Sequence, residues 1–203
     1  VEYYSVGEEK YASMLYELEK AERFIFMEYF IIDHGKMWNT ILDILERKAE
    51  QGVEVRLLYD GMGSQFLLPN HYDKYLETKG IKCRIFNEFR PFLSTAQNNR
   101  DHRKILVIDG TTAFNGGVNL ADEYINEKER FGHWKDTAVM LKGEAVWSFT
   151  VMFIQMWEWK TKQLSDYEKY RPANISQFNR ISEGYVLPYG DSPTDNEPVG
   201  ELV

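Results

Sequence analysis

The sequence predicts an α/β fold in which a mixed, largely parallel sheet carries helices on both faces. Helical and strand-like hydrophobic patterns alternate over the first 85 residues, which indicates strands joined by helical crossovers. The strand runs are apolar at successive positions, as is typical of strands buried on both faces. Hydrophobic residues make up 43% of the 203 positions and aromatic residues 15%, which is enough for one sizeable core.

The elements of the first half follow from hydrophobic spacing and from glycine stops. Apolar residues three and four positions apart mark helices, and runs of aromatic and β-branched residues mark strands. Gly52 and Gly80 end two of the helices. In order, we expect a helix through Met14, Leu15 and Leu18, a strand over 23–32, a helix over 38–49, a strand over 53–59, a helix over 69–79 and a strand over 81–86.

The pattern changes after a polar loop at 87–100. The pair Asp109-Gly110 separates two strand-like runs, which is a strong signal for a hairpin. The remaining elements are strands over 105–108, 111–115 and 137–141 and a helix over 146–157. We expect the folded domain to cover residues 1–165, and residues 166–203 to form a C-terminal extension with a turn-rich linker near 190–198.

Charge and composition disfavour some functions. The formal net charge of −8 argues against nucleic acid as a partner, because a nucleic-acid binder usually carries the opposite sign. Cys83 is the only cysteine, so no internal disulfide forms. No run of about 18 apolar residues is present, and the chain begins at Val1 without a signal peptide. We therefore expect a fragment, soluble as such, of a longer protein whose membrane segments lie elsewhere.

The hairpin is expected to gather polar groups on one face. His102 and Lys104 are two residues apart on a strand, so their side chains point the same way. A two-residue loop at Asp109-Gly110 pairs Ile108 with Thr111, Lys104 with Asn115 and His102 with Gly117. Gly117 and Asn119 then share the face of His102 and Lys104. This group suits one phosphate, with Lys104 supplying charge and Asn119 donating a hydrogen bond.

An isolated H-x-K pair on a strand is usually part of a solvated face, but two features favour a binding site here. The strand is apolar on both parities from Ile105 onward, so its polar start lies at a sheet edge, where open α/β sheets bind ligands. The local charge also reverses sign, which in an acidic protein predicts an anionic ligand. The cations that outnumber Glu88 and Asp101 in this region are Lys82, Arg84, Arg90, Arg100, Arg103 and Lys104.

The motif His102-x-Lys104-x-x-x-x-Asp109, followed by Gly116-Gly117-x-Asn119, resembles the HKD motif of the phospholipase D superfamily. Other segments are similar to bacterial cardiolipin synthases, namely Glu28-Tyr29-Phe30, residues 48–53, Tyr59-Asp60-Gly61 and Trp134-Lys135-Asp136. The resemblance covers nearly the whole chain. It implies a phospholipase-D-like half domain, the first catalytic half of an enzyme that makes cardiolipin from two phosphatidylglycerols.

The resemblance also implies roles for individual residues. His102 attacks phosphorus and forms a phosphohistidine, which requires a neutral imidazole. Asp136 corresponds to the carboxylate that orients this histidine, with a solvated strand-edge carboxylate as the alternative. Asp109 belongs to the motif, although its place in the turn favours a structural role. The candidate substrate-binding residues are Gly117, Arg103 and His133. No spacing of histidines and carboxylates matches a metal site, so we expect neither a metal nor another cofactor.

The family site needs two such motifs, and this sequence contains one. We therefore expect pairing with a second HKD half, either the protein's own C-terminal half or a second copy, and little activity unless the chain dimerises. The expected substrate is phosphatidylglycerol at the cytoplasmic face of the cell membrane, reached through segments outside this chain. Two alternatives stay open: a homodimeric phosphodiesterase acting as a nuclease or lipid hydrolase, and a non-catalytic module that binds anionic headgroups.

Overall fold

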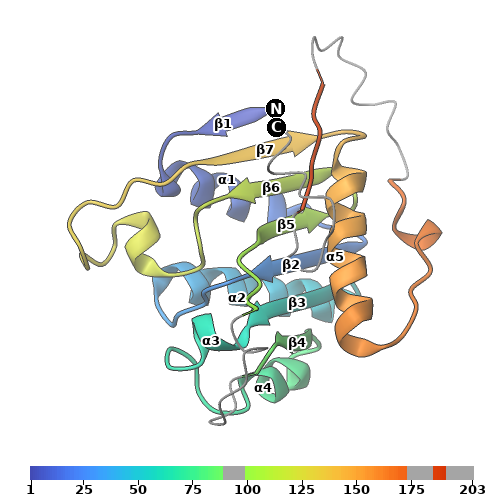
Figure 1. Cartoon of the computed structure of the whole chain (residues 1–203), viewed down its shortest axis with the longest axis horizontal. Coiled ribbons are helices and arrows are strands. Elements are labelled where there is room, and N and C mark those ends of the chain that lie inside the picture. Colours follow the sequence, from blue (N-terminus) through green and yellow to red (C-terminus); the bar gives the residue numbers. More distant parts are fainter. Residues whose placement is uncertain (89–98, 173–184, 191–203) are drawn as a thin grey trace.

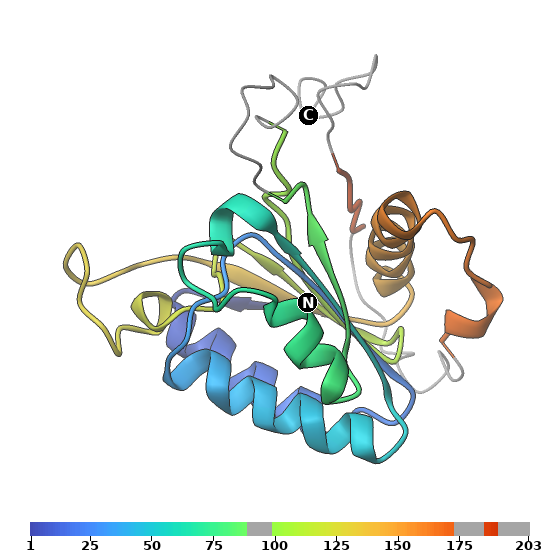
Figure 2. The ribbon, with the colours of Figure 1, turned by 90° about the horizontal axis from the view of Figure 1, so that it is seen from below.

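A seven-stranded mixed sheet lies between two layers of helices in the computed structural model, which describes residues 1–88, 99–172 and 185–190 (Figures 1 and 2). The strands are β1 (Glu2–Tyr4), β2 (Phe24–Tyr29), β3 (Glu54–Asp60), β4 (Lys82–Phe86), β5 (Lys104–Ile108), β6 (Thr112–Gly116) and β7 (Ala138–Lys142). The helices are α1 (Gly7–Glu19), α2 (Lys36–Glu50), α3 (Gly61–Ser64), α4 (Tyr72–Thr78) and α5 (Val146–Thr161), with 3₁₀ turns η2 (Asp122–Ile125) and η3 (Glu168–Tyr170). Figure 2 shows α1, α2 and α4 on one face of the sheet and α5 on the other.

The mixed α/β class is confirmed, with parallel pairing confined to one side of the sheet. The strand order is β1-β7-β6-β5-β2-β3-β4. Among the described strands, only β2, β3 and β4 pair in parallel, a smaller share than the sequence suggests, and the other neighbours are antiparallel. The reason is that helical crossovers join strands only in the first 85 residues. After them a tight hairpin joins β5 to β6, and a hairpin makes neighbours antiparallel.

Two hydrophobic cores form because the central strands are buried on both faces. In β2, Ile25 and Met27 belong to the core under α1 and α2, whereas Phe24 and Phe26 belong to the core under α5. The Phe26 ring stacks on Phe153 of α5 with ring centroids 4.6 Å apart. Burial of a side chain of this size stabilises a fold by about 1.5–3 kcal/mol. The predicted burial of these strands on both sides is confirmed.

Most predicted elements are present, with differences at their ends. The helix expected from Pro69 begins at Tyr72, because His71 before it has a left-handed backbone with φ of 59°. The sequence did not indicate β1, α3 or η2, each of only three or four residues. None of the described helices is long and apolar enough to cross a membrane.

Packing continues beyond residue 165. The buried ring of Tyr170 lies 5.1 Å from Phe24 and 5.0 Å from Phe26, measured between ring centroids. Its hydroxyl accepts a hydrogen bond from Arg56. The core under α5 therefore includes part of the predicted extension. Beyond Gly190, the predicted linker lies outside the described residues.

The hairpin register differs from the predicted one. Ile108 pairs with Thr112, so the three residues 109–111 connect β5 to β6. Asp109 adopts a left-handed backbone, with φ of 54°, and its carboxylate bonds the backbone of residues 22–24. The predicted two-residue loop and its cross-strand pairs are therefore wrong, because a one-residue slip exchanges the faces of one strand relative to its neighbour. The site residues meet instead through the turn that follows β6.

One edge of the sheet carries the site. The pairing registers bring the C-terminal ends of β2, β3, β4 and β6 to the same edge as the N-terminal ends of β5 and β7. His102, Lys104, the turn 117–119 and Asp136 all adjoin these ends. Asp109 follows the other end of β5 and lies at the opposite edge.

Candidate active site

His102 is an exposed imidazole immediately before β5. Its ring meets the ring of Phe30 edge-on, with centroids 4.8 Å apart. Partial burial and the positive charge of Lys104 lower the pKa of His102 below 6.5, while Asp101 and Asp60 oppose the shift. The imidazole is therefore neutral at pH 7, which is the nucleophilic form.

Lys104 presents a buried ammonium beside that imidazole. The residue is 4% exposed, and its Nζ donates to the His102 carbonyl oxygen at 2.5 Å and lies 5.4 Å from the centre of the Phe30 ring. Burial lowers the pKa of Lys104 to about 8, and the nearby charges of Asp101 and Asp136 limit the shift. Among the described side chains, no carboxylate lies within ion-pair distance of this ammonium. Its charge is therefore available to an anion.

Asp136 and Gly117 are in direct contact. A β-carbon built at Gly117 would lie 2.0 Å from Asp136 Oδ1, so the carboxylate occupies the space that any side chain would need. Asp136 Oδ1 accepts a hydrogen bond from the Thr137 amide at 2.8 Å, and its charge acts on Lys104. The hydrogen bonds of Asp136 in the described structure do not include His102, so its orienting role stays a prediction.

Asn119 ties the turn after β6 to the end of β2. Its side chain is 2% exposed. The amide oxygen accepts from the Ile31 amide at 3.0 Å, and Nδ2 donates to the Tyr124 hydroxyl at 2.9 Å. An amide nitrogen carries two hydrogens, so one donor remains for a phosphate oxygen. Asn119 therefore holds the turn after β6 against the end of β2 and Tyr124. Its contact with a phosphate remains a prediction.

Asp109 holds the opposite edge of the sheet together. Its carboxylate accepts from the backbone amides of Glu22, Arg23 and Phe24 at 2.8 to 2.9 Å, which fixes the start of β2. The whole of β5 separates Asp109 from His102. This placement agrees with the structural role favoured by its position in the turn.

The predicted concentration of free positive charge is largely absent from the site. Lys82 pairs with Glu54 at the start of β4, Arg84 pairs with Glu77, Arg100 pairs with Asp60 and Arg103 pairs with Glu28. Arg90 lies outside the described residues. The number of nearby cations therefore overstated the free positive charge at the site, because sequence neighbours on a strand point to different partners. The anionic ligand itself stays a prediction. Of the described cations in this set, only Lys104 has no carboxylate within ion-pair distance.

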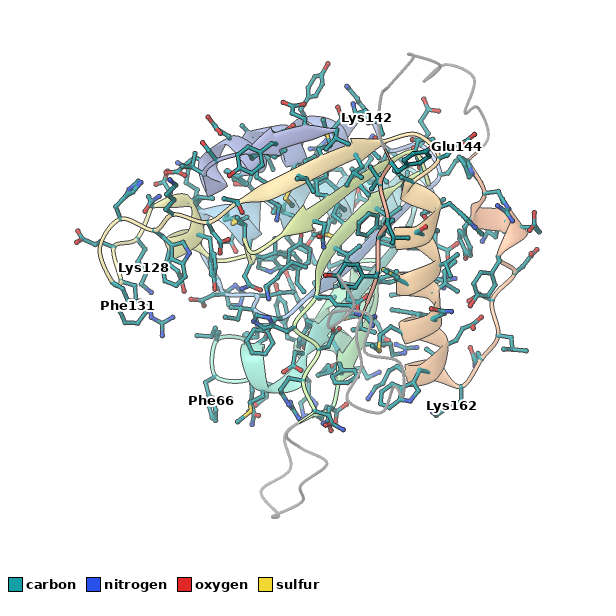
Figure 3. The ribbon with its side chains drawn as sticks, turned by 45° about the horizontal axis from the view of Figure 1, so that its top comes forward. Phe66, Lys128, Phe131, Lys142, Glu144 and Lys162 are labelled. Atoms are coloured by element: carbon teal, nitrogen blue, oxygen red, sulfur yellow. The ribbon has the colours of Figure 1, made fainter. Side chains whose placement is uncertain are left out.

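The two remaining predicted binding residues lie at the margins of the site. The Arg103 side chain is 30% exposed and its guanidinium lies 3.3 Å from a Glu28 carboxylate oxygen. His133 is exposed on the loop before β7. Figure 3 shows Phe131 of that loop and Phe66, which follows α3, pointing outward on the side away from Lys142 and Glu144. These placements leave substrate contact by Arg103 and His133 as predictions.

Asp60 is a site residue that the motif did not reveal. Its buried carboxylate accepts from the amides of Met62 and Gly63, and it also accepts from the Asp101 amide at 3.0 Å. It thereby links the end of β3 to the residue next to His102. The signal in the sequence was Asp60-Gly61 directly after a buried strand, which predicted only a turn.

Glu28 and Asp101 form a buried acidic pair next to His102. Glu28 is fully buried, and each carboxyl group has one oxygen without a hydrogen-bond partner in the described structure. Burial, reinforced by the charge of Asp101, raises the pKa of Glu28 well above 4.5, while Arg103 opposes the shift. Asp101 Oδ1 accepts from the Arg103 amide at 3.2 Å, which favours its charged form. Burial also raises the pKa of Asp101, while its hydrogen bonds oppose that shift, so Glu28 is the more readily protonated of the two carboxyl groups.

In the described part of the chain, no three histidine, cysteine or acidic side chains come together as metal ligands.

A nucleophilic imidazole and a buried ammonium at one sheet edge call for comparison with known families. Residues 14–157 match the family model described as cardiolipin synthase, PLD-like domain. The chain belongs to this family. The cardiolipin synthase of Geobacillus kaustophilus is 44% identical over 156 residues, 76% of this chain and 31% of that protein. The cardiolipin synthase of Alkalihalophilus pseudofirmus is 41% identical over 171 residues, 84% of this chain and 34% of that protein.

A Streptococcus mutans protein is more similar, 57% identical over 204 residues that cover 100% of this chain and 43% of that protein. The chain thus spans less than half the length of each of these three relatives. Among solved structures, NucT from Helicobacter pylori matches with a TM-score of 0.59 at 14% identity, over 77% of this chain and 94% of that one. The phospholipase D family member Nuc from Salmonella typhimurium matches with a TM-score of 0.53 at 18% identity, over 77% and 89%. These two structures confirm the predicted phospholipase-D-like fold.

Proposed function

We propose that this chain supplies one half of a phosphatidyltransferase site, with His102 attacking the phosphorus of phosphatidylglycerol. The observation that carries the proposal is the pairing at one sheet edge of an exposed imidazole with a lowered pKa and a buried ammonium. Among the described side chains, no carboxylate lies within ion-pair distance of that ammonium. The first supplies a nucleophile at neutral pH, and the second supplies charge to the phosphate oxygens.

The reaction runs as two displacements. A nitrogen lone pair of His102 attacks phosphorus, the bond from phosphorus to the glycerol oxygen breaks, and the departing oxygen takes a proton from an acid in the second half of the site. The hydroxyl of a second phosphatidylglycerol then attacks the phosphorus of the phosphohistidine, and the phosphorus–nitrogen bond breaks. The proton of that hydroxyl returns to the acid in the second half of the site. Cardiolipin and the free imidazole result. Lys104 stabilises the phosphate oxygens in both steps, while Asp136 orients His102 in the tautomer that leaves the attacking nitrogen bare.

The second half of the site comes from a second HKD motif. Relatives named cardiolipin synthase are about three times as long as their match to this chain, which leaves room for another such domain. A second copy of this chain is the other source. Protonation of the leaving oxygen accelerates such a step by about 10² to 10⁴-fold, so the chain without a partner half should turn over slowly. We place the reaction at the cytoplasmic face of the membrane, reached through segments outside this chain.

A phosphodiesterase that transfers to water is the second candidate, favoured by the fold that the chain shares with the phospholipase D family member Nuc. The net charge of −8 disfavours nucleic acid as its substrate. A non-catalytic module that binds anionic headgroups is the third.

The test is phosphatidyl transfer by the full-length natural protein on phosphatidylglycerol vesicles. We expect cardiolipin and free glycerol in equal amounts, a phosphohistidine trapped by alkaline quenching, and a rate reduced by about 10³-fold or more in His102→Asn. The control is His71→Asn, because His71 is exposed and asparagine tolerates its left-handed backbone. Phosphatidic acid as the product would favour the hydrolase, and binding without turnover would favour the headgroup module. Full activity in His102→Asn would overturn the assignment of the nucleophile.

A further inference from the structure

A fully buried lysine lies directly behind the candidate active site. Lys10 is on the first turns of α1 and is 0% exposed. Its Nζ donates to the Val118 carbonyl oxygen at 3.0 Å and to the Tyr29 hydroxyl at 3.5 Å, and lies 5.2 Å from the centre of the Tyr29 ring. No motif of the family resemblance includes this residue.

The contact with Val118 connects Lys10 to the turn that builds the site. Val118 lies between Gly117, which touches Asp136, and Asn119, which bonds the end of β2. The start of α1 is itself pressed against this region, since a β-carbon on Gly7 would lie 1.9 Å from the Tyr124 carbonyl oxygen. The ammonium therefore anchors the middle residue of the turn from a fixed position.

The charge of Lys10 acts on the same groups. The titratable side chains that face it are Tyr29 of β2, Lys104 of β5 and Asp136 before β7. Burial lowers the pKa of Lys10 to about 7, with Lys104 adding to the shift and Asp136 opposing it. An apolar side chain of similar length would fill this space without the cost of burying an ammonium, so packing does not account for a lysine here.

We propose that Lys10 is a positioning residue of the phosphate site, which anchors the turn at Val118 and adds a second positive charge behind that of Lys104. The inference rests on the proposed function, because it assumes that this edge binds a phosphodiester. It deepens that function by assigning two cations from different elements to one anion. The turn supplies the geometry, and the pair of cations supplies the charge.

The test compares Lys10→Met with a matched variant, Lys48→Met, in the full 203-residue chain. Lys48 is also buried, and its Nζ donates to a backbone carbonyl, that of Ala21, at 3.0 Å near the opposite edge. The probe is glycerophosphoglycerol, the deacylated headgroup, because a phosphodiester keeps one negative charge from about pH 5 to about pH 9. Its dissociation constant is measured by phosphorus NMR across that range.

We expect Lys10→Met to weaken binding about 5- to 20-fold at pH 6, and Lys48→Met to bind within about twofold of the unaltered chain. The affinity of the unaltered chain should fall as pH rises through 7, because Lys10 loses its charge there. This stepwise fall in affinity near pH 7 should be missing in Lys10→Met and present in Lys48→Met. Equal affinities and equal pH profiles in the two variants would overturn this inference alone. An unaltered chain that does not bind the probe would overturn the proposed function and this inference with it.

Should Lys10→Met fail to fold, Tyr29→Phe provides the second variant. It keeps the ring and removes the hydroxyl that accepts from Lys10. Loss of that acceptor destabilises the ammonium, so the step in affinity should move below pH 7. An unchanged step would overturn the role of Lys10.

Discussion

The carboxylate of Asp136 occupies the space where Gly117 would carry a side chain. The distance from a β-carbon at Gly117 to Asp136 Oδ1 would be 2.0 Å, and both carboxylate oxygens would lie within 2.6 Å of it. Position 117 therefore requires glycine because any side chain there would overlap the Asp136 carboxylate. It couples the turn after β6 to the carboxylate that acts on Lys104.

Gly117→Ala should reduce catalysis more than it reduces stability. The added methyl group must displace Asp136, and a displacement of about 1 Å within a site costs on the order of 10²-fold in rate. The free energy of unfolding should fall by about 1–3 kcal/mol, as in other overpacked sites. Transfer rates and thermal melts of the full-length protein check both. The control is Gly52→Ala, which strains a backbone with φ of 89° in open space and should keep its activity. Full activity in Gly117→Ala would show that the carboxylate can move without consequence.

Asp136→Asn and Asp109→Asn should have opposite balances of activity and stability. Asp109 accepts three backbone hydrogen bonds, and an asparagine would turn its NH₂ toward one of those donors. We expect Asp109→Asn to lose about 2–4 kcal/mol of unfolding free energy and to keep most activity once folded.

Asp136→Asn keeps its shape but removes the negative charge that supports the ammonium of Lys104. Activity should fall strongly, and the loss should be greatest above pH 7 because the pKa of Lys104 drops further. Initial rates and urea melts of both variants are the measurements. An inactive but stable Asp109→Asn beside an active Asp136→Asn would reverse the two assignments.

The sequence was sufficient for most elements because hydrophobic spacing is a local property. It could not fix the hairpin register, because Asp109 bends left-handed to reach amides 85 to 87 positions earlier in the chain. No local pattern carries such a contact. The same limit hid β1, whose three residues form a strand through pairing with β7, more than 130 positions later in the chain.

The imidazole and the ammonium of the candidate site were predictable from the sequence, but the buried residues around them were not. H-x-K spacing indicates an imidazole beside an ammonium, and the structure places them together. Lys10 and Glu28 were missed as site residues because each lies on an element that looks like ordinary core and meets the site only after the chain folds. Nearby cations misled for a related reason, since the salt-bridge partners of Lys82 and Arg84 are set by neighbouring elements.

The value of kcat/KM should follow a bell-shaped dependence on pH. His102 must be neutral, and because its pKa is lowered, the rising limb should lie below pH 6.5. Lys104 must be charged, so the falling limb should lie near pH 8, broadened toward pH 7 by Lys10. In Lys104→Arg the rate should be lower but the limb near pH 8 should disappear, because a guanidinium stays charged. A limb that persists unchanged in this variant would belong to another group.

Glu28→Gln should make the stability of the protein less sensitive to pH. The folded-state pKa of Glu28 is raised, so the folded protein holds a proton that the unfolded chain releases above about pH 4.5. The stability that comes from this group is fully present below that pH and is lost as pH rises through the folded pKa. Glutamine cannot ionise, and it keeps the size and shape of the protonated carboxyl group. The fall in Tm as pH rises above about 4.5 should therefore be smaller than in the unaltered protein, by about 2–4 °C for each kcal/mol recovered.

Glu54→Gln is the control, because the contribution of Glu54 to stability should change with pH in the opposite direction. Hydrogen bonds from Lys169, Lys82 and Arg56 hold the pKa of Glu54 well below its usual range, despite partial burial. Its stabilising effect is present above about pH 4.5 and is lost as pH falls, so Glu54→Gln should lower Tm at pH 7 and hardly change it in acid. Thermal melts of both variants across the same buffers distinguish the two cases. If Glu28→Gln behaves like Glu54→Gln and loses stability at pH 7, Glu28 is ionised and its pairing with Arg103 outweighs burial.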